Sequence, residues 1–138
     1  MFLLDTNSFD LYLRGNANVV RQIEANLRSV FISSIVVEEK LTGRISFINL
    51  ARKENNSLSV VRAHEDLMKT QVDLRLFPVL TYSDAADAVY TALPAKAKRA
   101  GTQDCRIAAQ AIAHGLTVVT CDADDFSVIG APFVDWSA

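Results

Sequence analysis

Short, uninterrupted apolar runs alternate with helix-spaced segments along this chain, and that alternation restricts the folds it can adopt. The runs are Phe2–Leu4, Val30–Ile32, Leu76–Leu80, Leu116–Thr120 and the shorter Phe133–Val134. Runs without polar alternation are typical of strands that are buried on both faces, as in parallel sheets covered by helices. We therefore expect an α/β fold, a three-layer α/β/α domain around a central, mainly parallel sheet of four to five strands.

Apolar residues between these runs recur at helical spacing. They predict helices over about 19–27, 35–51, 58–72, 84–93 and 104–114, with Gly115 as a left-handed stop. Pro78 should confine its strand to an edge or an end of the sheet, because proline cannot donate to a strand ladder. With 138 residues, no internal repeat and no linker, we expect one domain spanning residues 1–138.

Charge and hydropathy restrict the partners of the chain. The net charge of −2 argues weakly against a nucleic-acid partner. Residues 1–62, however, carry eight Lys/Arg against six Asp/Glu, and residues 63–138 carry six against ten, so the acidic excess lies in the second half. No apolar run is long enough for a membrane span, and Asp5 interrupts the first run where a signal peptide would continue. We expect no membrane partner and a cytoplasmic location.

Acidic residues follow the expected strands where parallel strands would bring them together. Asp5 comes directly after one strand, and Asp122 stands two residues past the end of another. Glu39 lies about one and a half turns into the helix after a third. Asp104 begins a helix, and Asp125 lies near Asp122. Converging carboxylates repel one another unless a cation neutralises them. Oxygen ligands suit one or two Mg²⁺ or Mn²⁺ ions, and such sites commonly act on phosphate.

Motifs spread over nearly the full length of the chain form a recognisable set. In chain order they are Leu4-Asp5-Thr6-Asn7, Ile32-Ser33-Ser34-Ile35 followed by Glu39 and Leu41-Thr42-Gly43, Asp104 with Ile107-Ala108-Ala109, the stretch 113–120, Asp125-Phe126 and Val134-Asp135-Trp136. In order and spacing this set resembles the PIN-domain ribonucleases, in particular the VapC-type toxins of prokaryotic toxin–antitoxin pairs.

The resemblance assigns roles to individual residues. It makes Asp5, Glu39, Asp104 and Asp122 the family's catalytic and metal-binding acidic quartet, adds Asp125 as a nearby metal ligand, and gives Thr6, Asn7 and Thr120 supporting polar roles. Because Glu38 precedes Glu39 directly, the sequence leaves open which of the two faces the site. The chain also has Cys121 where the family commonly has a basic residue.

The resemblance further implies an activity and partners. The expected protein is a Mg²⁺- or Mn²⁺-dependent endoribonuclease that hydrolyses phosphodiester bonds of structured RNA such as tRNA. It would be a homodimer, and it would act as a toxin that a cognate antitoxin protein inhibits.

Two other hypotheses for the function compete with the ribonuclease hypothesis. In a haloacid-dehalogenase-like phosphatase Asp5 would be the nucleophile, but that family usually has a second Asp two residues later, where this chain has Asn7. A non-catalytic PIN-fold binding module could have lost its acids, yet all four are present here.

Overall fold

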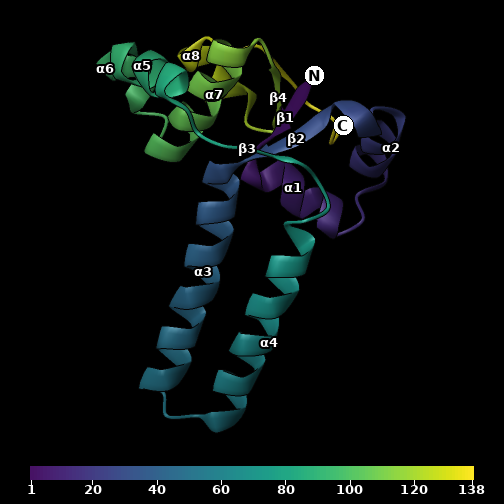
Figure 1. Ribbon diagram of the computed structural model, residues 1–138, viewed down its shortest axis with the longest axis vertical. Helices are drawn as coiled ribbons and strands as arrows, with labels where there is room; N and C mark the ends of the chain where they lie inside the picture. The colour runs from purple at the N-terminus through teal and green to yellow at the C-terminus, as the bar shows by residue number, and fades with distance from the viewer.

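Five parallel strands form one sheet at the centre of the computed structural model, which describes residues 1–138 (Figure 1). The strands are β1 (Phe2–Leu4), β2 (Val30–Ser33), β3 (Val79–Leu80), β4 (Thr117–Val119) and β5 (Phe133–Val134). Their order across the sheet is β3-β2-β1-β4-β5, and every neighbouring pair is parallel. The predicted α/β fold with a parallel sheet is therefore confirmed.

Helices flank this sheet, as the alternating sequence pattern predicts. They are α1 (Thr6–Leu13), α2 (Ala17–Ala25), the 3₁₀ helix η1 (Leu27–Ser29), α3 (Ser34–Lys53), α4 (Ser57–Asp73), α5 (Asp84–Ala92), α6 (Ala95–Lys98), α7 (Thr102–His114) and α8 (Ala123–Ile129). Figure 1 shows α5 to α8 gathered on one side of the sheet and α1 on the other. None of the helices combines the length and the apolar character needed to span a membrane.

The core lies between the central strands and the helices that cover them. Leu3, Leu4, Ile32 and Val118 have no exposed surface, because strands in the middle of a covered parallel sheet are buried on both faces. Gly115 ends α7 in the left-handed conformation, with φ of 66°. This is the stop that the sequence predicts, and it turns the chain directly into β4.

The third strand is shorter than its apolar run predicts. The run begins at Leu76, but only Val79 and Leu80 pair with β2, and they form an edge strand directly after Pro78. Phe77 turns into the core instead, where its ring packs 5.2 Å from that of Tyr12, between ring centroids. The prediction that proline limits this strand to an edge is confirmed, and the expected strand over 76–80 is too long.

Helices α3 and α4 pack along each other as a hairpin that extends away from the sheet (Figure 1). Their helical spacing is as predicted, and α3 continues through Gly43 without a break. On α3 the side chain of Ile45 is 51 % exposed, whereas Ile48 and Ala51, further along the helix, are buried. The periodicity therefore specifies a helix, but not which of its apolar residues are covered.

Candidate functional site

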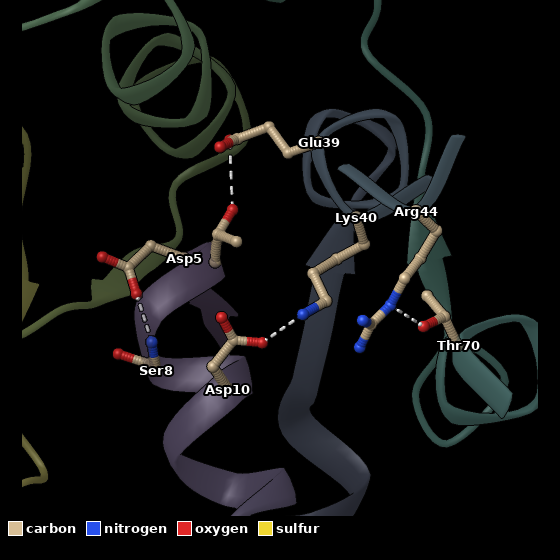
Figure 2. A network of polar contacts seen from close by, with 8 residues as sticks. Asp5, Ser8, Asp10, Glu39, Lys40, Arg44 and Thr70 are labelled. Carbon is tan, nitrogen blue, oxygen red and sulfur yellow. Dashed lines mark hydrogen bonds and ion pairs between the residues drawn. The ribbon is translucent and has the colours of Figure 1, made fainter. Parts of the chain in front are cut away.

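The carboxylate of Asp5 is fixed at the end of the central strand β1. Asp5 is buried and caps α1, and its Oδ1 accepts a 2.7 Å hydrogen bond from the backbone N–H of Ser8 (Figure 2). The Ser8 hydroxyl in turn donates to the carbonyl of Val119 in β4, at 2.9 Å. Burial raises the pKa of Asp5 and the charge of Asp122 adds to this, while hydrogen bonds from Thr120 and Ser8 oppose it.

Glu39 reaches toward Asp5 from the second turn of α3. Its Oε1 accepts a hydrogen bond of 3.0 Å from the hydroxyl of Thr6, the residue after Asp5 (Figure 2). Glu38, on the same helix, is exposed and accepts a hydrogen bond from Gln103 instead. The geometry thus separates two adjacent acids that the sequence could not distinguish, and it turns Glu39 toward Asp5.

The tightest group of acids comes from the start of α7 and the start of α8. Asp104, Asp122 and Asp125 each offer a carboxylate oxygen, and these oxygens all lie within 4.8 Å of one another. The pKa of Asp104 is raised from 3.8 to about 6, chiefly by burial and then by the negative charges of Asp5, Glu39, Asp122 and Asp125. The electrostatics of Asp104 therefore links all five acids.

Helix α8 explains the position of Asp125. The sequence predicts Asp125 as a metal ligand near Asp122 but predicts no helix there. In the structure Asp122 is the N-cap residue and α8 begins at Ala123. Residues three apart at a helix start lie on the same side, so Asp125 joins Asp122 as a full member of the group.

The supporting polar residues have different environments. Thr120 is fully buried, and its hydroxyl accepts a 2.9 Å hydrogen bond from the backbone N–H of Asp122 at the end of β4. Thr6 orients Glu39. Asn7, in contrast, is exposed on α1, and its side chain makes no hydrogen bond to the acids. Ser8, which sequence reasoning missed, holds Asp5 in place; its spacing of three residues after a capping Asp is the available signal.

The donor set fits a hard divalent cation. The five acids offer oxygen atoms, and none of them forms an ion pair, since the only ion pair in the structure is Lys40–Asp10. Oxygens bound to one Mg²⁺ at about 2.1 Å lie no more than about 4.2 Å apart, so small side-chain rotations would bring Asp104, Asp122 and Asp125 into coordination. A carboxylate cluster without a basic partner is an arrangement that Mg²⁺ or Mn²⁺ would stabilise.

Comparison with known proteins identifies the family of this chain. The family model for the PIN domain matches residues 2–132. The chain is 32 % identical over 146 aligned positions to plasmid stability protein StbB of Pseudomonas syringae pv. tomato, and all of both chains is covered. It is 33 % identical to toxin FitB of Neisseria gonorrhoeae, with 91 % of each chain covered.

A solved structure of similar fold is DNA-bound VapBC from Salmonella typhimurium. It matches with a TM-score of 0.74 and 27 % identity over 98 % of this chain and 97 % of that chain. Sequence and fold thus agree over almost the whole length, and the resemblance seen in the motifs is confirmed. The chain belongs to the PIN domain family.

Proposed function

We propose that this chain, as a single domain over residues 1–138, is a Mg²⁺- or Mn²⁺-dependent endoribonuclease. The observation that carries the proposal is the convergence of Asp104, Asp122 and Asp125 beside Asp5 and Glu39, with no basic side chain to neutralise them. Asp5, Glu39 and Asp104 have raised pKa values, and perturbed carboxylates that meet at one site are typical of functional sites. Binding a divalent cation next to a phosphodiester is the use that fits oxygen-only donors at the carboxyl edge of a parallel sheet.

Each acid has a role that follows from its surroundings. Asp104, Asp122 and Asp125 would hold the cation, and Asp5, fixed by Ser8 and Val119, would supply a rigid carboxylate next to them. A bound cation would lower the pKa of a coordinated water and offset charge on the scissile phosphate. Glu39, with its raised pKa and its hydrogen bond from Thr6, would orient the attacking water and accept its proton.

We further propose that the protein is the toxin of a toxin–antitoxin pair, that its substrate is a structured RNA such as tRNA, and that it acts in the cytoplasm. The relative from Neisseria is named a toxin, and the Salmonella structure is a VapBC complex with DNA. The family resemblance also supports a homodimer and a cognate antitoxin. Exposed apolar side chains along the α3–α4 hairpin support protein partners, since single-chain soluble proteins seldom expose many of them together.

Cleavage of total RNA, with the cut ends mapped, tests the activity and the substrate together. Asp104→Asn or added EDTA should abolish cleavage, while Asp124→Asn, which changes an exposed neighbour of the cluster by the same charge, should retain it. Circular dichroism should show that both variants are folded. If cleavage survives Asp104→Asn, Asp5→Asn and EDTA together, the metallonuclease proposal is wrong. Release of phosphate from small monoesters, with RNA left intact, would identify a phosphatase instead.

A further inference from the structure

A groove lined by basic and acidic side chains begins at Glu39 and runs between α1, α3 and α4. It consists of two adjoining hollows with volumes of about 260 and 240 Å³, and both are lined by Asp10, Lys40 and Arg44. The first hollow reaches Thr6 and Glu39, and the second continues to Arg14 and Lys69. The groove therefore leads from the carboxylate cluster to a region with four cationic side chains.

The guanidinium of Arg44 is held in place for binding. Its Nε donates a 2.8 Å hydrogen bond to the hydroxyl of Thr70, which is only 2 % exposed (Figure 2). Figure 2 shows the rest of the guanidinium turned toward the side on which Lys40 and Asp10 meet. Arg44 forms no ion pair, so its terminal amino groups keep their capacity to bind an anion in the planar, two-pronged way that suits phosphate.

Lys40 is paired with Asp10 across the same groove. Their Nζ and Oδ1 atoms are 2.5 Å apart, and the two side chains are 15 % and 27 % exposed. Both side chains line the groove, so a phosphate bound there would compete with the Asp10 carboxylate for Lys40.

The charges that line the groove balance in number, but most of them are unpaired. Arg14, Lys40, Arg44 and Lys69 face four carboxylates, those of Asp10, Glu39, Asp66 and Asp73. Lys40–Asp10 is the only ion pair, so the guanidinium of Arg44 has no carboxylate partner and can bind an anion. The cluster beside the groove is strongly acidic and would repel RNA without its metal, so a fixed cationic surface next to it is needed to hold the strand.

We infer that this groove binds the sugar–phosphate backbone of the RNA next to the cleavage site, with Arg44 and Lys40 as its phosphate ligands and Asp10 as a competitor for Lys40. The inference rests on the proposed nuclease function. Arg44 and Lys40 lie on α3 four residues apart, on one face of the helix that also carries Glu39. A strand bound to them would therefore enter the carboxylate site from the side of α3.

The test measures the binding of a short fluorescein-labelled single-stranded RNA by anisotropy. All variants are made in the Asp104→Asn background, in which the RNA should stay uncut. Arg44→Gln and Lys40→Gln should each weaken binding by roughly tenfold and lower the salt dependence by about 0.7 in the log–log slope. Asp10→Asn should strengthen binding about threefold, because it releases Lys40. Arg28→Gln is the matched control. Arg28 is exposed and lies just before the amino-terminal end of β2, whereas the acids lie at the carboxyl-terminal ends of the strands.

The inference is overturned if Arg28→Gln weakens binding as much as Arg44→Gln, if Asp10→Asn weakens it, or if both groove variants bind RNA like their parent. Its failure is distinguishable from failure of the proposed function. If the wild type cleaves RNA but Arg44→Gln binds RNA as tightly as its parent, only the groove proposal is refuted. If Arg44→Gln loses RNA binding but the wild type does not cleave RNA, the nuclease proposal is refuted and the groove proposal stands.

Discussion

Replacing Asp104 with Asn should stabilise the metal-free protein at neutral pH, although the change removes a site residue. Asp104 is drawn into a half-buried cluster with four other carboxylates, and its pKa is raised from 3.8 to about 6. The folded protein therefore binds the Asp104 proton more tightly than the unfolded chain does. Ionised Asp104 must then oppose folding, and neutral Asn should remove that opposition.

The size of the effect follows from the pKa shift. About two pKa units at 1.36 kcal/mol each set an upper limit of about 3 kcal/mol. Asp104 also lies in the first turn of α7, where a negative charge contributes about 0.3–1 kcal/mol that Asn would lose. The two terms together with partial solvent screening leave a gain of about 1–2 kcal/mol, or roughly 3–6 °C in the melting temperature of a chain of this size.

The pH dependence gives the prediction its sign. Well below pH 3.8 Asp104 is protonated in both the folded and the unfolded state, so the wild type and Asp104→Asn should be equally stable there. The wild type should lose stability relative to the variant as pH rises from about 4, where Asp104 of the unfolded chain ionises, to about 6, where Asp104 of the folded protein does, and the full difference should remain above pH 7.

Thermal unfolding by circular dichroism in EDTA, from pH 4 to pH 8, measures this difference. Asp124→Asn is the control, because it removes the same charge from an exposed position. A variant that is less stable than the wild type at pH 7.5 in EDTA would show that the carboxylates do not repel one another as the structure implies. The same result would follow if a Lys or Arg side chain of the protein neutralised these carboxylates in solution.

Three further predictions concern the metal, the pH profile and the core. Millimolar Mg²⁺ or Mn²⁺ should raise the melting temperature of the wild type. Asp122→Asn and Asp125→Asn should reduce that rise, and the control Asp124→Asn should not. Equal rises in all variants would contradict a metal site at these residues. Protons compete with the cation for carboxylates of raised pKa, so RNA cleavage at a fixed Mg²⁺ concentration should increase from pH 5 to pH 7. A higher Mg²⁺ concentration should shift this pH profile to lower pH. A pH profile that does not change with metal concentration would count against this competition. Gln110→Leu should lower the free energy of unfolding by about 2–4 kcal/mol in a urea titration. Gln110 is fully buried, and its side-chain amide forms hydrogen bonds with the Ser33 hydroxyl and the Leu80 carbonyl. A loss below about 1 kcal/mol would mean that water replaces the amide.

The sequence was informative wherever a local pattern has one physical solution. Apolar runs without polar alternation can only be buried strands or buried helix segments, and their short length favoured strands at Phe2–Leu4 and Val30–Ile32, where the structure has them. Gly115 and Pro78 acted through backbone restrictions that hold in any context. The helices α1 and α8 were not expected, because polar and acidic residues at their starts fit a turn as well as a helix cap.

The sequence alone was enough to predict a parallel α/β sheet, from its apolar runs, and carboxylates along one edge of that sheet, from the acids that follow strand ends. Only the tertiary structure decided which acids approach one another most closely, because side-chain direction depends on where each helix starts and on what it packs against. It turned Glu39 toward Asp5 and Glu38 toward Gln103, and it brought Asp125 beside Asp122. Likewise, Arg44 of α3 donates a hydrogen bond to Thr70 of α4 beside the groove. These residues are 26 positions apart, so no local sequence pattern encodes the contact.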